Sequence, residues 1–251
     1  MEPQPFRALL LRRLRLPLPL ASRSCRCRHF LDPEGDHRAA CSTAGVLARR
    51  GFPLEAAAAR VCREAGARVR TNVLVRDLNL GGLHATDARR LEVVANNLPL
   101  FGGAQLAVDA TLVSALRRDG SARPRAADND GAALAAARRR KERTYPELTG
   151  RGGRARLVVL GLEVGGRWSA EAWAFVRQLA KARARSEPDL LRRSAQAAWQ
   201  RRWVAVLSMA AQRAFAESLL ELPGVGGADG PLLSTADVLE DASYELGPLR
   251  A

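Results

Sequence analysis

The chain has 251 residues, of which 47% are apolar and 26% charged, a balance that excludes a collagen-like or wholly disordered protein. This length suits one domain with small attachments, and no apolar run is long enough for an ordinary transmembrane helix, so no membrane partner is expected. The formal net charge of +14 predicts a polyanionic partner, most simply nucleic acid. Nearly all basic residues are arginine, however, and a GC-rich genome produces the same excess, so charge alone identifies no binding surface.

Residues 1–24 form a basic leader. Arginines interrupt its apolar run at 6–20 and prolines end that run, whereas a secretory signal needs an uninterrupted apolar stretch. An arginine-rich segment with a single acid also has the composition of an organelle transit peptide, which is the lesser of two interpretations. We favour a short amphipathic piece left from a longer chain.

Three cysteines and a histidine gather directly after the leader in the pattern C-x-C-x9-H-x3-C. Thiolates and imidazole are preferred zinc ligands, and four of them close a tetrahedral structural site. The C-x-C end is tighter than the usual C-x2-C, and His29 is a substitute ligand that ranks below His37. The alternative is a set of unliganded cysteines in an arginine-rich tail. We predict a zinc knuckle at 25–42 with the ligands Cys25, Cys27, His37 and Cys41.

Helical and extended patterns alternate between residues 43 and 168. Alanine and leucine recur at helical spacing in the first stretch, and β-branched runs separated by turn residues follow. A good helix former and a short apolar run bounded by glycines come next. We expect a helix at 43–66, three strands within 68–118, a helix at 131–143 and a strand at 156–166.

The C-terminal part is expected to be helical and then loose. Two helices, at 169–185 and from 188 to 222, would pack on the preceding α/β core, and Ser186 with Asp189 resembles a capping box at the start of the second. Glycine, aspartate and proline are frequent in residues 223–251, which predicts a flexible tail.

Two lone carboxylates stand among apolar β-formers on neighbouring predicted strands, Glu92 and Asp109. Burial of a carboxylate is costly unless a cation or hydrogen bonds compensate it. Two such groups on paired strands can meet on one Mg²⁺, and Lys141 on the following helix could orient an attacking water. Glu64, on the helix before the first strand, could add a further carboxylate. The alternative is a pair of acids at strand ends and a solvated basic helix face.

These residues, in this order, resemble the PD-(D/E)XK restriction-endonuclease fold. The chain is most similar to the restriction-like endonuclease at the C-terminus of non-LTR retrotransposon polyproteins, in which a Cys/Cys/His/Cys knuckle precedes the nuclease. The stretches that carry the resemblance are GDHRAAC, RRLEVVAN, LAVDATLVS and KERTYPEL, and it covers about residues 20–222. It implies an α/β fold: a mixed sheet flanked by helices, with an N-terminal zinc knuckle and a C-terminal helical pair.

The resemblance also implies roles for individual residues. Glu92 would replace the aspartate of the PD motif, with Leu91 in place of the proline, and Asp109 would be the second acid. Thr111 stands at the usual lysine position, and Lys141 would supply that charge instead. Glu64 and Tyr145 complete the candidate catalytic set. The candidate phosphate contacts, for which a solvated helix face is an equal alternative, are Arg138, Arg139, Arg140 and Arg143.

The expected function is therefore metal-dependent nicking of target DNA by a retroelement-derived endonuclease. Structural Zn²⁺, catalytic Mg²⁺, a DNA partner with RNA as a further partner, and a nuclear location follow from the resemblance. Because the chain has no Tyr/Phe-x-Asp-Asp polymerase motif, it resembles the C-terminal remnant of a longer polyprotein, with the leader as the end of its polymerase region. A non-catalytic, zinc-knuckle nucleic-acid-binding remnant of the same origin is the main alternative. The third alternative is an unrelated α/β protein whose arginine excess reflects genome composition.

Overall fold

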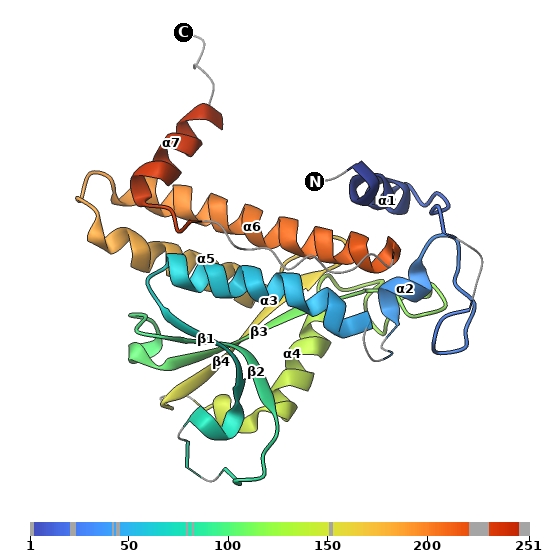
Figure 1. The fold of residues 1–251 in the computed structure, drawn as a ribbon, viewed down its shortest axis with the longest axis horizontal. Coiled ribbons are helices and arrows are strands. Elements are labelled where there is room, and N and C mark those ends of the chain that lie inside the picture. The colour runs from blue at the N-terminus through green and yellow to red at the C-terminus, as the bar shows by residue number, and fades with distance from the viewer. Residues whose placement is uncertain are drawn as a thin grey trace.

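A four-stranded mixed sheet lies at the centre of the fold (Figure 1). The computed structural model describes residues 3–20, 24–41, 43, 46–78, 80–81, 83–150, 153–220 and 231–245. Strands β1 (Arg68–Leu74), β2 (Arg90–Asn96) and β3 (Gln105–Val113) form an antiparallel meander, and β4 (Ala155–Glu163) pairs parallel to β3. Parallel strands require a crossover, which runs through helix α4 (Ala132–Thr144).

Helices cover both faces of the sheet (Figure 1). Helices α3 (Val46–Glu64), α5 (Ala170–Arg183) and α6 (Arg192–Leu220) lie on one face, and α4 lies on the other. Val108 and Leu160 enter the core under α3 and α6, whereas Ala107 and Val159 enter the core on the α4 face, as alternating strand residues must. The predicted mixed α/β class, with helices flanking a mixed sheet, is confirmed.

The N-terminal segment packs on the end of α6. Helix α1 (Pro3–Arg13) and the short helix α2 (Asp36–Ala40) contact α6 there, and Ala8, Leu18 and Ala39 share a small apolar cluster with Phe215 and Leu219. In addition, buried Asp36 forms ion pairs with Arg12 and Arg15, which join the leader to α2. The Cys/His segment is thus attached to the α/β core through α6.

Two expectations for the C-terminal part are wrong. Helix α6 begins at Arg192, because the Ser186 hydroxyl donates to the carbonyl of Arg183 at 3.0 Å and Asp189 pairs with Arg192 at 2.5 Å, so no capping box forms. Helix α7 (Thr235–Glu245) lies within the predicted flexible tail, since Val238 is buried against the main core. Residues 223–230 and 246–251 of that tail lie outside the described residues. Among the described helices, none combines the length and apolarity needed to cross a membrane.

Candidate functional site

The Cys/His segment folds back on itself through two local devices. Cys25 donates its backbone N–H to the His29 carbonyl and accepts from Arg28, both at 2.8 Å, which closes a tight turn around Cys27. The Asp32 carboxylate then accepts the backbone N–H groups of Asp36 (2.7 Å) and His37 (2.6 Å) and so begins helix α2. As a result, His37 on α2 and Cys41 directly after it return to the two cysteines of the turn.

The ligand atoms of Cys25, Cys27, His37 and Cys41 lie within 4.8 Å of one another. The two sulfurs of Cys25 and Cys41 are 3.8 Å apart, which matches the edge of about 3.8 Å of a tetrahedron with zinc–sulfur bonds near 2.3 Å. Cys27 Sγ lies 3.1 Å from Nε2 of His37. Burial and the nearby His29 lower the pKa of His37, which favours the neutral, ligating imidazole. The predicted cluster can therefore hold a metal such as zinc.

His29 allows a direct test of the ligand set. Its ring is exposed, and its Nδ1 lies 3.7 Å from Cys27 Sγ but also 3.2 Å from the Cys27 carbonyl. His29→Ala is expected to retain about one zinc per chain, whereas His37→Ala is expected to lose it, because only His37 is held by α2. Elemental analysis of the two purified variants measures this difference. Loss of zinc from His29→Ala alone would overturn the assignment.

The predicted acids and lysine meet on the α4 face of the sheet. Lys141 Nζ lies 2.6 Å from Oδ2 of Asp109 on β3 and 4.0 Å from Oε1 of Glu92 on β2. The second oxygen of Glu92 accepts the backbone N–H of Ala110 at 2.5 Å, and the Thr111 hydroxyl donates to Oδ1 of Asp109 at 2.7 Å. Asp109 is only 2% exposed and lies beneath the lysine. The pairing of the β2 and β3 strands thus joins residues 17 positions apart into one charged cluster.

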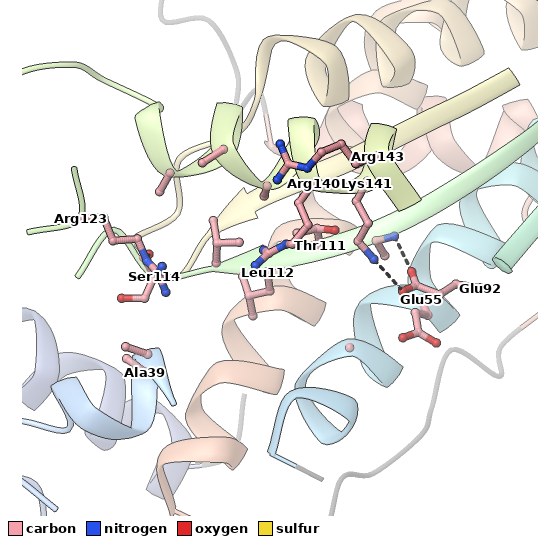
Figure 2. Close-up of a pocket in the computed structure, with 17 residues that line it drawn as sticks. Ala39, Glu55, Glu92, Thr111, Leu112, Ser114, Arg123, Arg140, Lys141 and Arg143 are labelled. Atoms are coloured by element: carbon pink, nitrogen blue, oxygen red, sulfur yellow. Dashed lines mark hydrogen bonds and ion pairs between the residues drawn. The ribbon is translucent and has the colours of Figure 1, made fainter. Parts of the chain in front are cut away.

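A third carboxylate at this cluster, Glu55 of α3, was not predicted from the sequence. It lines the same cleft as Glu92 and Lys141 (Figure 2). Burial and the Asp109 carboxylate raise the pKa of Glu55. Its signal in the sequence is modest: Glu55 shares a helical face with Ala58, Ala59 and Cys62, all of which are buried. A lone acid on the apolar face of a helix needs compensation, and the positive charge of Lys141 acts on Glu55 across the cleft.

Gly51 gives Glu55 the room to reach this position. A β-carbon at residue 51 would lie 2.6 Å from Glu55 Oε1, closer than real contacts allow. A side chain at residue 51 would therefore shift the flexible end of Glu55 from the position that it takes in the cleft.

Burial and mutual repulsion of the acids change their protonation. Burial, together with the carboxylates of Asp109 and Glu55, raises the pKa of Glu92 to about 8. Burial alone would lower the pKa of Lys141, but the Asp109 carboxylate outweighs it and raises that pKa above its usual value. At neutral pH, the metal-free cluster therefore contains a charged lysine and a largely protonated Glu92.

Glu64, the carboxylate predicted on this helix, is not part of the cluster. Its oxygens accept from Arg202 at 2.9 Å, from Arg60 at 3.0 Å and from the Trp203 indole at 2.7 Å. These contacts satisfy a buried acid and tie the C-terminal end of α3 to α6. The prediction that Glu64 adds a further carboxylate to the site is therefore wrong, because its oxygens are bound to Arg60, Arg202 and Trp203 outside the cleft.

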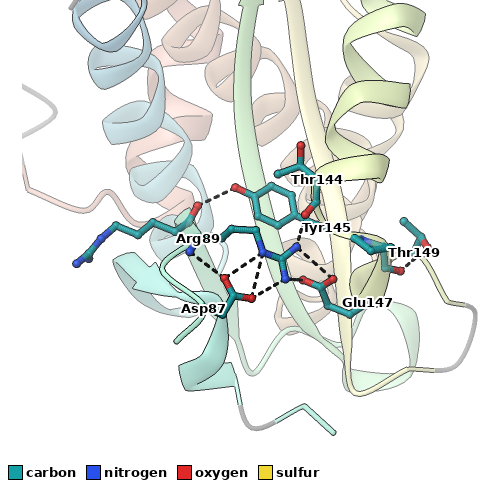
Figure 3. A network of polar contacts seen from close by, with 8 residues as sticks. Asp87, Arg89, Thr144, Tyr145, Glu147 and Thr149 are labelled. Atoms are coloured by element: carbon teal, nitrogen blue, oxygen red, sulfur yellow. Dashed lines mark hydrogen bonds and ion pairs between the residues drawn. The ribbon is translucent and has the colours of Figure 1, made fainter. Parts of the chain in front are cut away.

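Tyr145, which was predicted to be catalytic, makes structural contacts at the end of α4. Its hydroxyl donates to the carbonyl of Arg90 at 2.8 Å, and its ring lies under the Arg89 guanidinium, 5.7 Å from the ring centroid (Figure 3). Arg89 also binds Asp87, Glu147 and the carbonyl of Thr144. The network joins the C-terminal end of α4, the helix that carries Lys141, to the start of β2.

The cluster opens at one end of a cleft of about 690 Å³ along β3 (Figure 2). Arg140 and Arg143 line it beside Lys141, whereas Arg138 pairs with Glu142 and Glu171, and Arg139 is exposed and does not line it. Of the four predicted phosphate contacts, two thus face the cleft. Arg123, which was not predicted from the sequence, lines the opposite end of the cleft.

Comparison of the chain with protein-family models and with curated proteins finds no match.

Proposed function

We propose that the chain is a metal-dependent DNA endonuclease with a restriction-endonuclease-like core. The observation that carries the proposal is the meeting of Glu92, Asp109 and Lys141 at one end of an arginine-lined cleft. The order of one helix, three strands, a second helix and a fourth strand supports it, because the resemblance was drawn from this order of elements. Descent from a retroelement, a nuclear location and contact with RNA are parts of the same proposal that rest on the resemblance alone.

Hard carboxylate oxygens are the ligands that Mg²⁺ prefers, and Glu92 and Asp109 would hold it, with Glu55 as a third donor. When bound, Mg²⁺ supplies a Lewis acid and an activated water. The chain itself supplies the fixed positive charge of Lys141, which can neutralise charge developing on a phosphate. Thr111 orients Asp109 through its hydroxyl, and Arg140 and Arg143 can bind flanking phosphates.

One observation favours the alternative, a non-catalytic nucleic-acid-binding protein. The 2.6 Å ion pair between Lys141 and Asp109 satisfies the buried acid without any metal, and the lysine covers the carboxylate. Nuclease activity requires that this ion pair break, so that the Asp109 carboxylate can bind the metal. Nicking of supercoiled plasmid DNA in Mg²⁺ or Mn²⁺, but not in their absence, tests the proposal. A zinc-loaded, folded protein that never nicks DNA would leave the binding protein as the better account.

The two α3 acids are expected to behave differently. Glu55→Gln should lower the nicking rate about tenfold or more, because it removes a charge beside the cluster. Glu64→Gln should leave the rate of folded protein within about twofold but lower the melting temperature, since it weakens a buried ion pair. Parallel nicking assays and thermal unfolding measure the contrast. Equal effects of the two variants on nicking would contradict the assignment of Glu55.

Metal binding should depend on pH through Glu92. Because its pKa is raised to about 8, the carboxyl holds a proton at pH 7 that Mg²⁺ must displace. The apparent Mg²⁺ affinity should therefore fall about tenfold per pH unit below pH 8 and level off above it. Calorimetric titration in buffers of different ionisation enthalpy should find about one proton released per ion at pH 7. An affinity that does not change between pH 6 and pH 8 would contradict a protonated Glu92 in the metal-free site.

A further inference from the structure

The cleft extends well beyond the carboxylates. It follows β3 from Ala110 to Ser114, a length of about 14 Å at the usual rise of a strand. The acids lie at one end and Arg123 at the other, with Arg140 and Arg143 between them on the α4 side (Figure 2). A cleft of this length has room for more than one phosphate of a nucleic-acid strand.

Arg123 is held at the far end of the cleft by its own loop. Its Nε donates to the Ser114 carbonyl at 2.9 Å, and its backbone N–H donates to Ala115 at 2.8 Å. A backbone bridge between Leu116 and Ala122 closes the same loop. A guanidinium fixed through one nitrogen keeps its remaining donors oriented, which suits the binding of phosphate oxygens.

Alanine side chains from two helices line opposite parts of the cleft. Ala136 and Ala137 of α4 form one wall, and Ala39 and Ala40 of α2 form the other. The volume of about 690 Å³ is that of a site for a small ligand and accommodates a short stretch of one strand. Both helices that bound this volume pack on the core, α2 through α6 and α4 through β4, so the cleft has fixed sides.

We propose that this cleft binds one unpaired DNA strand, with one phosphate at the cluster of Glu92, Asp109 and Lys141 and a second phosphate at Arg123. The inference rests on the proposed function and narrows its substrate to single-stranded or locally unpaired DNA. In this proposal, Arg123 contributes to the preference for single-stranded over duplex DNA and takes no part in the chemistry.

Binding of fluorescent oligonucleotides to the full chain, without added divalent metal, tests the inference. The wild type is expected to bind a 12-nucleotide single strand at least about tenfold more tightly than the same sequence as a blunt duplex. Arg123→Ala should weaken single-strand binding about tenfold and reduce the salt slope by roughly 0.7, the contribution of one phosphate. Arg123→Lys should keep the wild-type salt slope, because it retains the positive charge. Its affinity should lie between those of the wild type and Arg123→Ala, because lysine lacks the planar set of donors of a guanidinium.

Arg177→Ala is the matched control, since Arg177 is exposed on α5 and does not line the cleft. It should change binding by less than about twofold. Equal affinity for duplex and single strand, or equal effects of Arg123→Ala and Arg177→Ala, would overturn the inference even if plasmid DNA is nicked. A strand preference that depends on Arg123, in a protein that never cleaves, would support the cleft assignment and refute the nuclease.

Discussion

Asp109→Asn is expected to lower magnesium-dependent nicking by more than about 100-fold while DNA binding changes little. The substitution keeps the size of the side chain and an oxygen for the Thr111 hydroxyl, so the fold should tolerate it. It removes a charged ligand from a hard cation and the partner that holds Lys141 in place, 2.6 Å away. The arginines that line the cleft are unchanged, which is why affinity for DNA should persist.

The matched control is Asp189→Asn, at an exposed acid that pairs with Arg192 on the surface. It should nick DNA at the wild-type rate. Single-turnover nicking and oligonucleotide binding, measured side by side, separate chemistry from affinity. If Asp109→Asn nicks as fast as Asp189→Asn, the carboxylate cluster is not the catalytic centre.

The second large effect is expected at the Cys/His cluster. The double variant Cys27→Ser, His37→Ala should lose the single zinc ion and local order in residues 25–41. Helix α2 has only five residues, too few to persist without tertiary support, and Ala39 is its contribution to the small cluster on α6. Since Ala39 and Ala40 also line the cleft, its wall should loosen as well.

Elemental analysis and amide hydrogen exchange test this result independently of any activity. Exchange should accelerate in residues 25–41 and remain slow in β3 and β4, whose core positions are buried on both faces of the sheet. His84→Ala, at an exposed histidine far along the chain from the cluster, serves as the control and should keep its zinc. Zinc retained by the double variant would require a different ligand set.

Local features of this protein could be predicted from the order of its residues. The β-branched runs predicted all four strands, because residues such as those of RLVVLGLE fill a sheet that is buried on both faces. The C-x-C-x9-H-x3-C spacing predicted the grouping of four metal-ligating side chains, since a turn and one helical turn suffice to close so short a segment. Lone acids within apolar strands likewise marked Glu92 and Asp109 as groups that need a cation nearby.

Contacts between residues far apart in the chain could not be predicted, because they depend on how the helices and strands pack. Glu55 and Glu64 are both acids on helix α3. Because α3 packs against α6, Glu64 forms an ion pair with Arg202, whereas Glu55 lines the cleft. At the start of α7, the Thr235 hydroxyl accepts a hydrogen bond from the Trp199 indole at 3.2 Å. The two residues are 36 positions apart, and no local pattern in the tail predicts this contact. Arg123 became a cleft residue because its loop closes on Ser114. Helix packing and strand register fix these contacts, and both depend on the whole core, whereas propensity and spacing depend only on neighbours in the chain.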